Sequence, residues 1–492
     1  MSWDCEKSPN VQELEKISHL YFREIYVKYN APIDTQNAME NTIQACLQYS
    51  MSIQPLGKPM SPKIFPTVRV LQVLLIMLIS SIFAMGVESE KPDIPKEFIR
   101  TEGTKFVDGE GNEFIIRAKG LWNGNPATAM RATDFNEGTY RKLASIGFNA
   151  VRFYFAADTF ENVSSESVTY KEDAFEWLER HIAWAKKHHM KIVMNMHHSP
   201  GAATIHAPGL FTNPNQDRFV ALWRTIAERY ANEPTILGFD LINEAKCRIL
   251  SGDTPENRFV GAFNLYQNLI QRTIDAIREV NNNHVIIVER LWISGVDEAA
   301  LGVPTIGYYN TLPNDQRDTW QNVNGKFNFP DLVDHNYAYT YHVYEPSRFV
   351  FQYTGASDGR FDDDGSGGPN RVYPSDIVAK WDVIDPKTGR SWTMNKDFLE
   401  YAYTIPLDYI RNIKGVPAFV GELGVHVSNF ENNAAGVNKG ARQWILDTME
   451  ILDRHKLSFS YHSYRINEYH PIFNEHLESA FREAFQLFFY GE

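Results

Sequence analysis

Two glutamates, each at the end of a short apolar run, are the residues of this chain best suited to acid–base chemistry. Glu244 follows the run 236–243, and Glu422 lies in the run 417–424. Continuous apolar runs of this length are typical of strands buried on both faces of a parallel sheet. Carboxylates at the ends of two such strands can act on one bond, because one donates a proton while the other attacks. Hydrolysis of a glycosidic bond requires this pair of roles.

Two further polar residues, Arg152 and Asn243, are also found in apolar runs that predict strands, and we expect them to support the two carboxylates. Arg152 lies inside the apolar run 149–155 and needs a carboxylate partner, because an unpaired buried charge is costly. We expect that partner to be Glu422, which would then stay ionised; a purely structural salt bridge is the alternative. Asn243 directly precedes Glu244, where its amide is placed to hydrogen-bond a sugar hydroxyl.

Histidine and tyrosine side chains complete the predicted site. His197 ends the run 191–197 and is expected to contact substrate or to support a residue that does. His342 and Tyr344 alternate along one strand, so their side chains face the same way. The tyrosine is expected to orient Glu422 and the histidine to tune the acid, with ordinary core packing as the alternative. Distinct roles require a raised pKa at Glu244 and a lowered pKa at Glu422.

Alternating strands and helices must position these residues. Helical periodicity covers 173–189, 216–230, 258–280 and 437–455. Strands are predicted at 114–122, 148–155, 191–197, 236–244, 284–293, 337–344, 418–424 and 457–464. This alternation predicts an α/β fold, a (β/α)₈ barrel whose active site lies at the carboxyl ends of the strands.

Connections outside the barrel strands are also predicted. The segment 105–114 is expected to form a β-hairpin that turns at Asp108-Gly109 and plugs the bottom of the barrel. Long loops, 294–336 and 345–397, follow the fifth and sixth strands and are expected to wall the catalytic face.

The N-terminal part of the chain divides into two segments ahead of a catalytic domain at 87–492. Segment 60–86 has a basic flank, an apolar stretch and small residues, which is typical of a signal peptide. An uncleaved membrane anchor is the alternative, and both interpretations put the barrel outside the cytosol. Residues 1–59 form an extension of unknown role, or an artefact of a start upstream of Met60.

Composition limits the classes of partner. The net charge of −13 over 492 residues argues against nucleic acid or an anionic membrane surface. The three cysteines Cys5, Cys46 and Cys247 form no CxxC, and neither HExxH nor a GxGxxG after a strand occurs. We therefore expect no metal and no cofactor. The pair of carboxylates further indicates a polysaccharide or oligosaccharide substrate, and we expect the protein to be a monomer.

These motifs, in this order, resemble glycoside hydrolase family 5, the cellulase-like retaining barrels, over roughly residues 100–480. The resemblance implies that Glu244 is the acid/base and Glu422 the nucleophile, with carboxyl groups about 5 Å apart and retention of configuration. It implies no cofactor. The supporting residues implied by the resemblance are Arg152, His197, Asn243, His342 and Tyr344.

Two departures from the family pattern concern the site. The family usually has a proline after the acid/base, and this chain has Ala245, which we expect to shift the local backbone only modestly. The family usually ends the eighth strand in a tryptophan beneath the reacting sugar, whereas no tryptophan occurs in 457–465. Phe459, Tyr461 or His462 is expected to supply that platform, so Tyr461 and His462 join the predicted substrate-binding residues.

The resemblance implies an endo-β-1,4-glucanase, and segment 60–86 predicts that it is secreted or anchored outside the cytosol. β-Mannan, β-1,3-glucan and exo-acting glucosidase activity stay open, because the same chemistry serves all of them. A non-catalytic carbohydrate-binding barrel is the alternative from another class. Loss of either glutamate would favour it, and both Glu244 and Glu422 are present.

Overall fold

The computed structural model describes one compact unit of the chain, which lies within Asp93–Glu492. The predicted extension and leader, 1–86, and most of the loops 294–336 and 345–397 lie outside the described residues. Within the part that is described, no helix combines the length and apolar character needed to cross a membrane. The described residues are 94–121, 135–164, 167–201, 208–211, 213–245, 255–291, 329–350, 371–378, 391–425, 439–464 and 475–490.

Eight parallel strands close into a barrel whose neighbours follow one another in chain order. Each overlaps one of the predicted strand ranges, so the predicted barrel is confirmed. The strands are β3 (Arg117–Leu121), β4 (Ala150–Ala156), β7 (Lys191–His198), β8 (Ile236–Asp240), β9 (Val285–Glu289), β10 (Tyr337–Val343), β13 (Ala418–Leu423) and β14 (Ser458–Tyr464).

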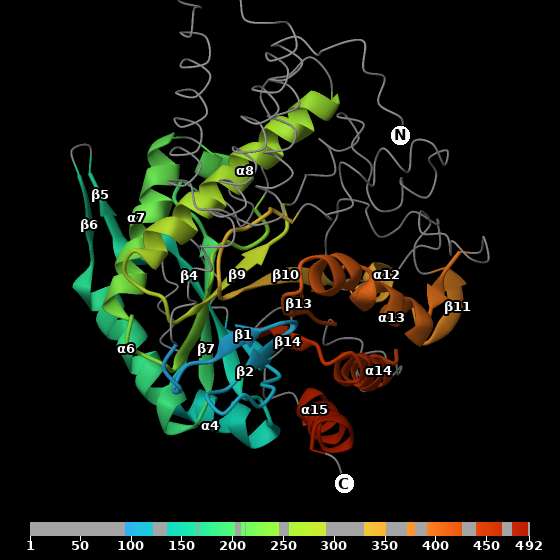
Figure 1. Cartoon of the computed structure of the whole chain (residues 1–492). Helices are drawn as coiled ribbons and strands as arrows, with labels where there is room; N and C mark the ends of the chain where they lie inside the picture. Colours follow the sequence, from blue (N-terminus) through green and yellow to red (C-terminus); the bar gives the residue numbers. More distant parts are fainter. Residues whose placement is uncertain are drawn as a thin grey trace, which may run out of the picture. The chain divides into compact units, whose positions relative to one another are not determined.

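Helices lie outside the ring of strands (Figure 1). Their apolar faces pack on the barrel wall; α6, for example, buries Phe175, Leu178 and Ile182, which recur at helical spacing. The longer helices are α4 (Glu137–Ile146), α6 (Glu172–Lys187), α7 (Asn213–Arg229), α8 (Pro255–Arg278), α13 (Lys396–Thr404), α14 (Ala441–Arg454) and α15 (Glu475–Phe488).

Shorter elements extend the connections between strands and helices. They are α5 (Ala157–Phe160), α12 (Ser347–Val350), η1 (Pro208–Phe211), the π-helical turn η2 (Asp408–Ile413), and the two-stranded sheets β5 (Glu161–Val163) with β6 (Val168–Tyr170) and β11 (Ser375–Val378) with β12 (Thr393–Met394).

A small N-terminal hairpin packs against the interior of the barrel, as predicted, but its main pairing differs from the prediction. Strand β1 (Arg100–Glu102) pairs with β2 (Lys105–Val107), so the turn falls at Gly103, whose φ is 55°. The predicted turn after Asp108 also forms, yet it closes only one bridge, between Val107 and Glu113.

The upstream pairing has a packing reason. Ile99 and Phe106 enter the same apolar cluster as the inward-facing barrel residues Ala118, Val193 and Phe419. The lower half of the barrel is therefore filled with apolar side chains, which leaves the carboxyl ends of the strands for polar groups.

Candidate active site

Arg152 is the centre of a buried polar network at the carboxyl ends of the strands. Its side chain is fully buried, and its Nη1 lies 2.7 Å from Glu422 Oε1. Its Nε donates to Asp240 Oδ2 at 2.7 Å, and its Nη2 donates to Asn243 Oδ1 at 3.0 Å. The structure thus brings together the expected pair of Arg152 and Glu422, and it places Asn243 beside them.

A register shift in β13 aims Glu422 into the barrel. The pairing runs from Tyr341 with Val420 to His342 with Glu422, so one residue of β13 is skipped. The skipped residue is Gly421, where a Cβ atom would lie only 2.3 Å from the Thr340 hydroxyl. The glycine before Glu422 therefore lets the strand bulge and turn the carboxylate inward.

Glu422 is held as an anion. Its Oε2 accepts a hydrogen bond from the Tyr344 hydroxyl at 2.8 Å and lies 3.4 Å from His462 Nδ1. Burial disfavours the charged form, but interactions with His462, His342 and Arg152 outweigh burial and hold the pKa of Glu422 well below its usual range.

Glu244 lies beyond the end of β8 in an unusual backbone conformation. Its φ is +41°, a left-handed value that is uncommon for any residue other than glycine. Its N–H donates to Glu289 Oε2 at 2.6 Å. The next residue is Ala245, and a proline there would favour an extended conformation at Glu244. The side chain of Glu244 is 14% exposed, whereas that of Glu422 is 5% exposed.

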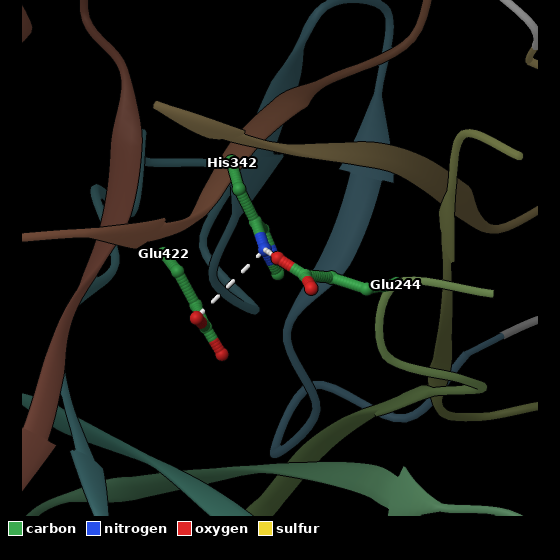
Figure 2. A group of neighbouring side chains, drawn as sticks. All are labelled: Glu244, His342 and Glu422. Atoms are coloured by element: carbon green, nitrogen blue, oxygen red, sulfur yellow. Dashed lines mark hydrogen bonds and ion pairs between the residues drawn. The ribbon is translucent and has the colours of Figure 1, made fainter. Parts of the chain in front are cut away.

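His342 lies between the two carboxylates (Figure 2). Its Nδ1 is 3.0 Å from Glu244 Oε1 and 3.8 Å from Glu422 Oε2. Burial disfavours its charged form, but three carboxylates outweigh burial and raise the pKa of His342 to about 9. They belong to Glu289, Glu422 and Glu244, so the surroundings of His342 favour its imidazolium form.

His197 and His462 line the other side of Glu422. His197 Nδ1 is 2.9 Å from Asn195 Oδ1 and 4.0 Å from Glu422 Oε1, and its ring stacks on Tyr154 at 4.4 Å. Burial lowers the pKa of His197 well below its ordinary value, so this ring is neutral. The Tyr154 hydroxyl lies 3.2 Å from His462 Nδ1.

Tyr461 does not lie with these groups. Its ring packs edge-on against Phe481 of α15 at 4.8 Å, and its hydroxyl faces the backbone of Val425. Phe459 likewise packs outward, near Phe485. Successive residues of a strand face opposite sides, so only His462 of the three platform candidates faces the site. The structure thus places Tyr461 away from the two glutamates, against the expectation that it lies with them, and its contact with substrate stays untested.

Two buried carboxylates of the site were missed from the sequence. Asp240 ends β8 and pairs with Arg152, and Glu289 ends β9 beside Glu244 and His342. Each interrupts an apolar run, which is the same signal that singled out Arg152. The rule that a buried charge needs a partner would have found both.

One ligand atom from each of Glu244, His342 and Glu422 lies within 4.8 Å of the others, which is close enough to surround a cation. The same three groups can also pass a proton, and Glu422 is already paired with Arg152 at 2.7 Å. The expectation of no cofactor stays a prediction.

Comparison with known proteins identifies relatives of this chain. It is 25% identical to Endoglucanase C of Acetivibrio thermocellus over 72% of this chain and 91% of the relative. It is 24% identical to an endoglucanase of Paenibacillus polymyxa over 58% of this chain and 66% of the relative. A β-xylosidase of Phanerodontia chrysosporium is 24% identical over 39% of this chain and 46% of that protein.

A solved structure of an endoglucanase from Thermotoga maritima is similar to this chain with a TM-score of 0.48 at 18% sequence identity. The similarity covers 75% of this chain and 97% of the Thermotoga maritima chain. Residues 107–468 match the family Cellulase (glycosyl hydrolase family 5). The match spans most of the chain and includes every strand of the barrel, so this protein belongs to glycosyl hydrolase family 5.

Proposed function

We propose that this protein is a retaining β-glycoside hydrolase, with Glu422 as nucleophile and Glu244 as acid/base. One observation carries the proposal: a carboxylate oxygen of Glu244 and one of Glu422 lie within 4.8 Å of each other. Retaining enzymes hold their carboxyl groups about 5–5.5 Å apart, whereas inverting enzymes leave room for a water between them.

In the first step, Glu422 attacks the anomeric carbon while Glu244 gives its proton to the leaving oxygen. A glycosyl ester forms on Glu422 and the aglycone departs. In the second step, Glu244 takes a proton from water, which attacks the same carbon and releases Glu422. Arg152 and Tyr344 each donate a hydrogen bond to one oxygen of Glu422, which fixes the orientation of the carboxylate for the attack.

For the substrate, we propose a β-1,4-linked glucan that is cleaved internally. Support comes from the relatives named endoglucanase in Acetivibrio thermocellus and Paenibacillus polymyxa. The tryptophan that the family usually places beneath the reacting sugar is absent from 457–465, and His462 of that segment lies 3.4 Å from Glu422. β-Mannan and β-1,3-glucan are therefore included as alternatives in the test.

The test is reducing-sugar release by the full chain from carboxymethylcellulose, mixed-linkage β-glucan, β-mannan, xylan and laminarin. We expect activity on one or two glucans and none from Glu422→Gln. Proton NMR of the first product should show the β-anomer, because two displacements retain configuration. Release of the α-anomer would overturn the two-step mechanism, and silence of the folded protein on every polymer would overturn the glucanase proposal.

We also propose that segment 60–86 directs the barrel out of the cytosol. The observation behind this is the basic flank and apolar stretch of that segment. N-terminal sequencing of the protein recovered from the culture medium, the membrane fraction and the cytosol tests it. A first residue near 87 supports a cleaved signal peptide, an anchored full-length protein supports the anchor, and a cytosolic full-length protein contradicts both.

A further inference from the structure

Glu289 is a third buried carboxylate beside the two reacting glutamates, and the mechanism above gives it no role. It is the last residue of β9, and its side chain is fully buried. The Tyr266 hydroxyl donates to its backbone carbonyl at 2.6 Å, which fixes the end of the strand. Burial of a carboxyl group away from water destabilises the folded protein unless contacts with other groups replace its lost hydration.

The first contact of Glu289 is with the backbone of Glu244. Its Oε2 accepts the Glu244 N–H at 2.6 Å, a short hydrogen bond to a residue with φ +41°. A left-handed conformation at a glutamate is unfavourable unless surrounding groups hold it. The carboxylate on β9 is therefore one of the groups that fix where the Glu244 side chain begins.

The second contact of Glu289 is with His342. The ring of His342 bridges two carboxyl groups, with Nε2 at 3.5 Å from Glu289 Oε1 and Nδ1 at 3.0 Å from Glu244 Oε1. A carboxylate on one side of an imidazole fixes the ring orientation and favours a proton on both nitrogens. The charge on Glu289 is thus transmitted through His342 to the carboxyl of Glu244.

We propose that Glu289 is a positioning residue for the acid/base: it holds the Glu244 backbone through one oxygen and keeps His342 oriented and protonated through the other. The inference rests on the proposed role of Glu244 as the acid/base. It predicts that Glu289 matters most for substrates whose leaving oxygen needs a proton.

The raised pKa of Glu289 predicts that the proposed activity depends on pH near neutrality. Burial, opposed by His342, raises the pKa of Glu289 to about 7, and the charge of Glu244 adds to the rise. The charged groups that face Glu289 are His342 from β10, Glu244 from the end of β8 and Arg152 from β4. Removal of one anion from this cluster weakens the hold of the remaining titratable groups on their protons.

The test compares Glu289→Gln with the full-length wild type on two substrates. One is the preferred glucan, and the other is an aryl β-cellobioside with a very acidic phenol, which needs little protonation. We expect kcat/KM on the glucan to fall about tenfold or more, and on the aryl substrate less than about threefold. The alkaline limb of the glucan profile should move to lower pH by about half a unit or more.

A matched control is Glu161→Gln. Glu161 is also a buried carboxyl group, but it is bonded to Arg218 of α7 at 2.6 Å. This variant should leave the ratio of the two activities and the pH profile unchanged. Glu289→Asp, which keeps the charge but shortens the side chain, is a second variant if Glu289→Gln does not fold. It should also lose more kcat/KM on the glucan than on the aryl substrate, by a smaller factor than Glu289→Gln.

Equal losses on both substrates, or no loss in either variant, would overturn the positioning role while leaving the proposed function intact. The wild type and Glu422→Gln, assayed alongside, separate the two ideas. Wild-type activity that disappears in Glu422→Gln supports the proposed function. A wild type that is silent on both substrates overturns the proposed function and the role of Glu289 with it.

Discussion

The surroundings of Glu422 and Glu244 differ more than their shared side chain suggests. Glu422 lies within β13 and is contacted by Arg152, Tyr344 and His462. Glu244 lies beyond the end of β8, has a left-handed backbone and contacts His342. In the proposed mechanism, strand β13 fixes the nucleophile, which must stay charged and aimed at the sugar. The connection after β8 carries the proposed acid/base, which must exchange a proton with the leaving oxygen and with water.

The largest loss of activity is expected when Glu422, the more tightly held of the two glutamates, is replaced in Glu422→Gln. An amide cannot form the glycosyl ester, so kcat should fall on the order of 10⁴–10⁶-fold. The measurement is kcat on the preferred glucan, with binding of the same oligosaccharide by calorimetry as the control for folding. A variant that keeps more than a few per cent of wild-type turnover would remove Glu422 from the role of nucleophile.

Glu244→Gln should show a smaller and more selective loss. Without the proton donor, kcat/KM on the glucan should fall about 10²–10⁴-fold, because that is the usual size of acid catalysis. The first step on an aryl glycoside with a very acidic phenol should be largely spared. Pre-steady-state release of the phenol measures that step directly, and an equal loss on both substrates would contradict the acid role.

Tyr344→Phe separates orientation of the nucleophile from its charge. It removes the 2.8 Å hydrogen bond to Glu422 Oε2 but leaves Arg152 in place. A hydrogen bond to a charged group is worth about 1.5–3 kcal/mol, so kcat should fall about 10- to 100-fold. Kinetics on the glucan check this, with Tyr373→Phe, which removes a hydroxyl bonded to Asp447 instead, as the matched control.

His342 predicts a pH dependence of stability as well as of activity. Its pKa is about 9 in the folded protein, above the ordinary value of 6.5. A raised pKa means that the folded state binds the extra proton, so this stabilisation is complete below pH 6.5 and is lost as pH rises through 9. The free energy of unfolding should fall by about 2 kcal/mol over that window.

Urea unfolding of wild type and His342→Asn at pH 6.5 and pH 9 measures this contribution. The wild type should lose stability between the two values, and the variant should lose less by the amount assigned to His342. Equal losses in both proteins would show that other groups carry the pH dependence.

Much of this arrangement could be predicted from the order of residues along the chain. Apolar runs that alternate with amphipathic helices predict a barrel. A lone arginine inside such a run requires a carboxylate partner, and this requirement predicts the pairing of Arg152 with Glu422. The inward turn of Glu422 could not be predicted, because it depends on a bulge at Gly421 that only the pairing with β10 defines. The same limit applies to the hairpin, whose pairing is decided by Ile99 and Phe106 in the barrel floor.

The smallest effect is expected at Tyr461, on the face of β14 opposite His462. Tyr461→Phe removes a hydroxyl that accepts from the Val425 N–H at 3.3 Å and donates to the Val425 carbonyl at 3.4 Å, and both distances are long for hydrogen bonds. The ring still packs on Phe481, so both kcat and KM should stay within about twofold of wild type. His462→Ala is the comparison, because it removes a ring that lies 3.4 Å from Glu422 and should change kcat. If Tyr461→Phe changed KM for the glucan while His462→Ala did not, Tyr461 rather than His462 would be the residue of β14 that faces the active site.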